Sequence, residues 1–163
     1  MNDTATSTAS VRIERTFDAP RELIWTMWTD PEAFARWYGP PGARVSVATM
    51  DVRVGGRRHL CMEMDTPNGA MQMWFTGEYR CVEAPSRLVY TESMSDPEGN
   101  VVPAVQMGMP PDHPDTTEVM VDLDDLGGRT RMIMTHAGLP AGSPAEHGWN
   151  AAFDKLRDAL TGA

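Results

Sequence analysis

The last part of the chain carries the longest helical pattern, and this pattern follows a series of strand patterns. Between Ser143 and Leu160, apolar residues recur at intervals of three and four, which places them on one face of a helix. That face holds Trp149, Ala152, Phe153, Leu156 and Leu160. Ser143 can cap the start of the helix, and Pro144 suits its first position. An aromatic helix face has to be covered, and the preceding strands can supply a sheet that covers it.

Alternating apolar and polar residues predict the strands of that sheet. The alternation marks Val11–Phe17, Arg44–Ala48, Asp51–Val54, His59–Met64, Met71–Cys81, Arg87–Met94, Glu118–Asp124 and Arg131–His136. Turn residues between the strands, such as Pro67-Asn68-Gly69 and Gly127-Gly128, are typical of hairpins. Gly77 lies inside one predicted strand and indicates a bulge or a bend there.

Two short helices are expected after the first strand. Pro20 opens one of them, whose apolar stripe is Leu23, Ile24, Met27 and Trp28. Pro31 begins the other, which is predicted to extend to Trp37. Hairpin-linked strands with helices at both ends predict the α+β class. We therefore expect a curved antiparallel sheet of about six to seven strands, wrapped around the long C-terminal helix.

Length and charge restrict the class of protein further. The 163 residues predict a single domain over residues 11–163, preceded by a disordered tail over residues 1–10 that is rich in Thr, Ser and Ala. The net charge of -9 predicts neither nucleic acid nor a membrane surface as a partner, because Lys and Arg bind such partners. The N-terminus lacks the pattern of a signal peptide, so we expect a cytoplasmic protein.

Six short motifs carry a family resemblance. In chain order they are Phe17–Pro20 with Ile24-Trp25, Trp28–Pro31 with Trp37–Pro40, Asp51–Gly56, Asp96–Pro103, Thr135–Leu139 and Gly148–Leu156. Together they resemble the START-like, helix-grip proteins of the SRPBCC superfamily, and in particular the homologues of the heat-shock-chaperone ATPase activator. The resemblance covers residues 11–160.

The resemblance implies a fold and a range of functions. It implies a deep apolar cavity between the sheet and the long helix. Members of the superfamily bind lipids, hormones and polyketides, and some catalyse cyclisation or related steps. The eukaryotic activators carry a second, chaperone-binding domain. We expect no such domain in a chain as short as this one, so an activator role is not the first expectation.

Methionine and aromatic residues are the candidate ligand contacts, because methionine is flexible and adapts to several apolar partners. The chain has 13 methionines, and many lie on strand faces that we predict to point inward. The candidate ligand-binding residues are Trp28, Met62, Met64, Met73, Phe75, Tyr90, Met132, Met134, His136, Trp149 and Phe153. These side chains can equally fill the core. The first hypothesis is therefore a protein that binds a small hydrophobic or amphipathic molecule.

A second hypothesis is an enzyme that uses the same cavity. His136 shares a predicted strand face with Met132 and Met134 and can exchange a proton with a ligand, assisted by Tyr90 or Glu92. A cyclase, dehydratase or hydrolase that needs no cofactor would result. A structural histidine bonded to backbone is the alternative for His136. The spacing of histidines, cysteines and carboxylates predicts no metal site, and His113 is expected to be solvated.

A third hypothesis is a chaperone-helper domain that binds another protein. It rests on the Pro- and Gly-rich loop Ser95–Pro114, which is long enough to be functional, and on exposed tryptophans. The loop can act as a lid or as a partner-binding segment, and a homodimer is also possible. At the sheet surface, Asp51 and Arg53 are expected to pair with Arg57, Arg58 or Glu63, or to stay solvated.

Overall fold

The computed structural model describes residues 10–161. Its elements are β1 (Ser10–Phe17), α2 (Arg21–Thr29), α3 (Pro31–Ala35), β2 (Arg44–Met50), β3 (Arg57–Thr66), β4 (Gly69–Glu83), β5 (Arg87–Ser95), the 3-10 helix η1 (Ala104–Met107), β6 (Thr116–Asp125), β7 (Thr130–Ala137) and α4 (Pro144–Thr161). The predicted disordered tail lies outside the described residues, except for Ser10, which begins β1. Among the described residues, no helix combines the length and apolar composition needed to span a bilayer.

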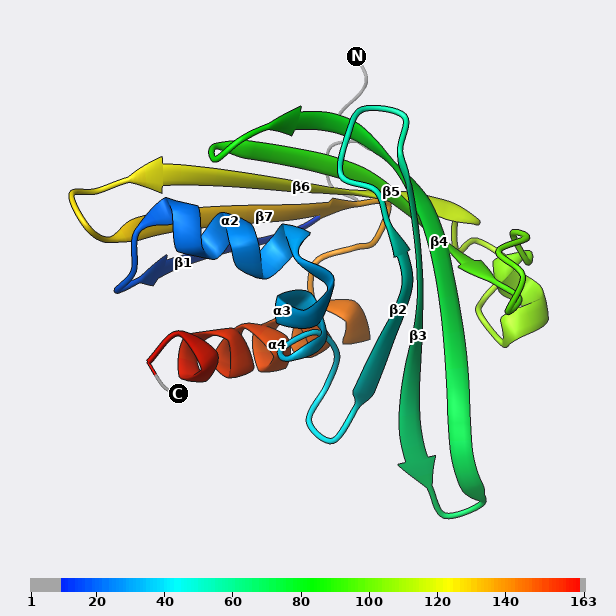
Figure 1. Cartoon of the computed structure of the whole chain (residues 1–163). Coiled ribbons are helices and arrows are strands. Elements are labelled where there is room, and N and C mark those ends of the chain that lie inside the picture. Colours follow the sequence, from blue (N-terminus) through cyan, green and yellow to red (C-terminus); the bar gives the residue numbers. More distant parts are fainter. Residues whose placement is uncertain (1–9, 162–163) are drawn as a thin grey trace.

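The seven strands form one sheet in the order β1-β7-β6-β5-β4-β3-β2. Every neighbouring pair is antiparallel. Figure 1 shows the sheet curling between β5 and β4, so that β2, β3 and β4 run at a steep angle to β1, β6 and β7. The three α-helices lie on the concave side. This architecture confirms the predicted α+β class, with two short helices after the first strand and a long C-terminal helix.

The short helices begin and end for local reasons. Asp30 ends α2 and caps α3, because its side chain accepts a hydrogen bond from the backbone N–H of Ala33 at 3.0 Å. Pro31 occupies the first position of α3, where a missing N–H costs nothing. The α3 helix ends at Ala35, two residues before the predicted end at Trp37.

An aromatic cluster joins α4 to the two short helices. Trp28, Phe34, Trp37 and Phe153 are buried at 1% exposure or less. The ring centroid of Trp28 lies 4.8 Å from that of Trp37 and 6.1 Å from that of Phe153. Trp149 reaches the same cluster, with its ring 5.5 Å from Phe153. The predicted apolar face of α4 is therefore covered by rings from α2 and α3 as well as by the sheet.

The predicted strand Asp51–Val54 is wrong. The backbone of this segment forms a turn, in which Arg53 N donates to Asp51 O and Gly56 N donates to Arg53 O. Gly56 permits this turn, because a Cβ there would lie 1.9 Å from Asp51 O. Asp51 and Arg53 pair with each other, with Oδ2 and Nε 2.8 Å apart. Short alternating runs next to glycines do not distinguish a strand from such a turn.

Gly77 in β4 marks a close approach of two backbones. The change in register between β4 and β5 falls between Tyr79 and Cys81, after the position that the sequence suggested. At Gly77, a Cβ would lie 1.9 Å from the carbonyl oxygen of Thr91. Only glycine lets the two strands stay this close.

We expect Gly77→Ala to lower the free energy of unfolding by about 1–3 kcal/mol, because the added methyl forces the strands apart. Gly148→Ala is the matched control. An added Cβ at Gly148 in α4 meets nothing within 4 Å, and alanine is the better helix former. Gly148→Ala should therefore raise the free energy of unfolding by about 0.5–1 kcal/mol. Urea titrations of both variants measure the two shifts, and equal shifts would contradict this account of Gly77.

Candidate functional site

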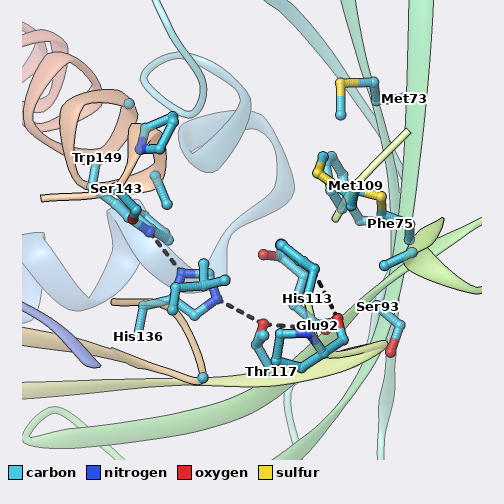
Figure 2. Close-up of a pocket in the computed structure, with 18 of the residues that line it drawn as sticks. Met73, Phe75, Glu92, Ser93, Met109, His113, Thr117, His136, Ser143 and Trp149 are labelled. Carbon is cyan, nitrogen blue, oxygen red and sulfur yellow. Dashed lines mark hydrogen bonds between the residues drawn. The ribbon is translucent and has the colours of Figure 1, made fainter. Parts of the chain in front are cut away.

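A cavity of about 660 Å³ lies between the sheet, the first half of α4 and the loop that joins β5 to β6. Figure 2 shows Ser143 and Trp149 on its helix side, with Met73, Phe75 and Met109 on the opposite side. Its large apolar lining residues are Met62, Met73, Phe75, Met94, Met109, Leu139 and Trp149. A volume of this size falls within the range of small-molecule sites, which is about 300–1,000 Å³.

Cross-strand pairs build the sheet side of the cavity. Met62 of β3 lies opposite Met73 of β4, and Phe75 of β4 lies opposite Met94 of β5. Residues directly opposite each other on antiparallel strands place their side chains in contact. The curl of the sheet carries these two pairs away from α4, so their side chains border the cavity instead of reaching the helix.

The loop between β5 and β6 supplies a further wall. Met109, Pro110 and His113 of this loop line the cavity. The loop is anchored at Ala104, whose backbone N–H donates to Asp115 Oδ1 at 2.8 Å. Val102 N donates to Met94 O at 2.9 Å, which ties the loop to the end of β5.

His136 lies in a chain of hydrogen bonds along one side of the cavity. Trp149 Nε1 donates to His136 Nδ1 at 3.0 Å, so the proton of the neutral imidazole is on Nε2. Nε2 then donates to Thr117 Oγ1 at 2.7 Å. Thr117 Oγ1 in turn donates to the carbonyl oxygen of Glu92 at 3.3 Å. Both imidazole nitrogens are therefore occupied by side chains of the protein, and they link α4 to β7 and β6.

Burial keeps the imidazole neutral. The pKa of His136 is lowered from 6.5, mainly because burial disfavours the charged form and also because His113 is nearby. Glu92 acts in the opposite direction without overcoming the effect of burial. A neutral His136 can accept the Trp149 hydrogen bond, whereas an imidazolium cannot.

Glu92 belongs to a buried group of polar side chains on the sheet. Tyr38 donates its hydroxyl to Glu92 Oε2 at 3.1 Å, and Arg58 Nη1 lies 3.7 Å from the same oxygen. The Arg58 side chain is 1% exposed. Its guanidinium lies over the ring of Tyr90, 3.7 Å from the centroid, and 5.4 Å from that of Phe34. The Arg58 charge is thus held between aromatic faces and one carboxylate.

Burial and neighbouring charges shift the pKa values of this group. The pKa of Tyr38 is raised, because its phenol is buried and lies beside the Glu92 carboxylate. Burial acts to lower the pKa of Arg58, but the tyrosines and Glu92 around it raise the pKa overall. Arg58 therefore stays charged, and Tyr38 stays a neutral donor to Glu92.

The structure brings together some of the predicted ligand contacts. Met62, Met73, Phe75, His136 and Trp149 line the cavity. Trp28, Tyr90, Met132, Met134 and Phe153 are placed in the core, each at 1% exposure or less, and do not line it. Met64 is half-buried and packs against that core. For Met132 and Met134, position along the strand explains the difference, since the cavity lies near the end of β7 that carries His136.

Sequence reasoning also missed residues of this region. His113, which was expected to be solvated, is half-buried and lines the cavity, with Nδ1 donating to Pro114 O at 2.9 Å. Arg58 was expected at the sheet surface and is buried. Its even spacing from Leu60 and Met62 was the signal that could have placed it inside. Met109 and His113 lie in a loop, where no periodicity predicts orientation.

Three further findings concern chemistry and partners. Within residues 10–161, no group of three or more His, Cys, Asp or Glu side chains is arranged to hold a metal ion. None of the five tryptophans, all of which are described, is fully exposed. The exposed large apolar residues of the long loop are Val101, Val105 and Met107.

The curled sheet that holds a long C-terminal helix over a cavity is the arrangement of the helix-grip proteins. The model of the family described as "Activator of Hsp90 ATPase homolog 1-like protein" matches residues 18–161. The chain belongs to this family, which is part of the SRPBCC superfamily. The resemblance found in the sequence is thereby confirmed.

Solved structures of other proteins share the fold. A protein from Arthrobacter aurescens is 25% identical with a TM-score of 0.75, and the match covers 96% of this chain and 88% of that one. A protein from Chromobacterium violaceum is 22% identical with a TM-score of 0.76, covering 95% and 99%. An AHSA1-like protein from Aeromonas hydrophila is 25% identical with a TM-score of 0.67, covering 93% and 92%. Among curated proteins, none matches this sequence.

The neutral state of His136 predicts a specific pH dependence of stability. The unfolded chain binds a proton at this histidine near pH 6.5, whereas the folded protein binds it only at lower pH. His136 therefore lowers the free energy of unfolding as the pH falls from about 6.5 toward its folded pKa. His136→Gln cannot titrate and can keep both hydrogen bonds. We expect it to lose less stability than the wild type between pH 7.5 and pH 5.

Denaturant titrations across this pH range measure the difference. His147→Gln is the control, because His147 is exposed on α4 and should leave the pH profile close to that of the wild type. A larger loss of stability in His136→Gln than in the wild type at low pH would indicate that His136 is protonated in the folded state.

Proposed function

We propose that the protein binds a small hydrophobic or amphipathic molecule in the cavity between the sheet and α4. The observation that carries the proposal is the cavity of about 660 Å³ with its methionine-rich lining. A mostly apolar cavity of this size with a few polar groups is typical of sites that bind small molecules. Flexible thioether side chains can adjust to its shape.

Polar groups at one side give the cavity an amphipathic character. Glu92, Thr117 and His136 come from β5, β6 and β7, whereas Met62, Met73 and Phe75 come from β3 and β4 and form an apolar wall. Few polar groups in a mostly apolar cavity are typical of sites that orient a ligand. A ligand with one polar end and an apolar body fits this division.

The hydrogen bonds of His136 favour binding over catalysis. A general acid or base needs a nitrogen within reach of the ligand, and both nitrogens of His136 are occupied by Trp149 and Thr117. Glu92 is engaged by Tyr38 and Arg58, and Tyr90 does not line the cavity. The enzyme hypothesis stays a prediction, with Glu92 as the acid/base candidate that does line the cavity.

The protein-partner hypotheses also stay predictions. The tryptophans that were expected to carry a chaperone-helper contact are buried or half-buried. What the loop offers a partner is the set of exposed side chains Val101, Val105 and Met107. A homodimer would also need an exposed apolar surface such as the one formed by Val101, Val105 and Met107. None of these three residues lines the cavity.

Filling the cavity from the helix tests the proposal. Gly148 lies in α4 and lines the cavity, and a Cβ built there meets nothing within 4 Å. In Gly148→Leu, the new side chain occupies space that a ligand would use. We expect Gly148→Leu to stay folded and to bind amphiphiles at least about tenfold more weakly, a loss of about 1.4 kcal/mol.

Native mass spectrometry of the protein with fatty acids, long-chain alcohols, sterols and polyketides gives the readout, together with the shift in melting temperature on binding. Gly148→Ala is the matched control, which should keep wild-type binding. Absence of any bound species and of any thermal shift in the wild type would overturn the proposal. Equal binding by Gly148→Leu would place the ligand elsewhere.

A further inference from the structure

We propose that the polar end of the ligand is a neutral or cationic hydrogen-bond donor, such as a hydroxyl or an ammonium group, that contacts Glu92, and that anionic amphiphiles are excluded. This inference rests on the proposed function, because it concerns the ligand of the same cavity. It names the chemical class of the polar end, which the apolar lining does not decide.

The charges that border the cavity all have one sign. Its lining includes three carboxylates, those of Glu92, Asp112 and Asp115. No Lys or Arg is among the described residues that line it. Asp112 and Asp115 are exposed and are screened by solvent, whereas Glu92 is buried, so a ligand carboxylate or sulfate beside Glu92 would meet a poorly screened negative charge.

The two nearest cations do not line the cavity. The guanidinium of Arg58 lies over the rings of Tyr90 and Phe34, and its Nη1 lies 3.7 Å from Glu92 Oε2. Lys155 Nζ donates to the carbonyl oxygens of Tyr38 and Pro40 at 3.3 Å and 3.1 Å. Neither cation lines the cavity, so neither can pair with an anionic ligand there.

Side-chain donors near Glu92 are also used within the protein. Tyr38 donates to Glu92, His136 donates to Thr117, and Thr117 donates to the backbone of Glu92. On the helix side, the hydroxyl of Ser143 has no partner. Because those three side chains already donate their hydrogen bonds within the protein, the groups near Glu92 can accept a hydrogen bond from a ligand but have none to donate.

Glu92 is the acceptor that is placed to receive the polar end. Its side chain is 9% exposed and lines the cavity. Oε2 is shared by Tyr38 and Arg58, whereas Oε1 has no hydrogen-bond partner within residues 10–161. Oε1 is not among the fully buried atoms, so this carboxylate oxygen is open to a hydrogen bond from a ligand hydroxyl or ammonium. Figure 2 shows Glu92 between Thr117 and Ser93 on this side of the cavity.

Three amphiphiles with the same chain and different polar ends test the proposal. Isothermal titration calorimetry at low ionic strength, below micelle-forming concentrations, compares 1-decanol, decylammonium and decanoate on the wild-type protein. We expect decanol and decylammonium to bind, and decanoate to bind at least about tenfold more weakly than decanol. Decyl methyl ether, which has no donor, should also bind more weakly than decanol.

Variants then assign the effect to Glu92. In Glu92→Gln the carboxylate is lost and Arg58 keeps its charge, so decanoate should gain affinity relative to decanol, and decylammonium should lose it. Glu83→Gln is the matched control, because it makes the same change at an exposed position of β4 that does not line the cavity. Circular dichroism checks that Glu92→Gln is folded. If it is not, Asp112→Asn, at an exposed position of the lining, replaces it and should narrow the gap between decanol and decanoate.

The outcomes separate this inference from the proposed function. Decanoate binding as tightly as decanol or tighter would overturn the inference and leave ligand binding intact. Binding by none of the four compounds, together with an empty result from the wider panel, would overturn the proposed function itself. Glu83→Gln changing the order of affinities as much as Glu92→Gln would show that net charge, and not Glu92, sets the preference.

Discussion

The burial of one helix face governs this structure. Trp149 and Phe153 of α4 cannot be left in water, and α2, α3 and the curled sheet together cover them. Ring pairs such as Trp28 with Trp37 and Trp28 with Phe153 each add about 0.5–1.5 kcal/mol beyond the area they bury. This cluster fixes the second half of α4 against the sheet. The site depends on the first half of the helix, where Trp149 both belongs to the cluster and lines the cavity.

The same curl that lets the sheet enclose α4 prevents it from touching the whole helix. The pairs Met62–Met73 and Phe75–Met94 lie where the sheet has turned away, and the loop after β5 closes the remaining side. Into this space the fold places two polar groups of different character. His136 is neutral, and both of its nitrogens form hydrogen bonds that connect α4 with β7 and β6. Glu92 has one carboxylate oxygen without a hydrogen bond to the described residues, so that oxygen can accept one from a ligand.

Much of the fold followed from the sequence, and less of the site. Periodicity correctly predicted α4 and the sheet, because every alternating strand except Asp51–Val54 had a core face to bury. Periodicity tells which face a side chain is on, but not where along the strand the cavity lies. Met132 and Met134 share a face with His136, yet only His136 reaches the cavity. Arg58 was misplaced for a different reason. A charged residue is expected at the surface, and the aromatic and acidic neighbours that allow its burial cannot be recognised from the sequence.

The position of Trp149 has an optical consequence. Of the five tryptophans in the chain, all of them described, Trp149 is the one that lines the cavity. Its indole N–H is fixed to His136, so the ring cannot reorient freely when its surroundings change. When water leaves the cavity, the surroundings of Trp149 change, and no other tryptophan lines the cavity. The fluorescence of Trp149 therefore reports directly on what the cavity contains.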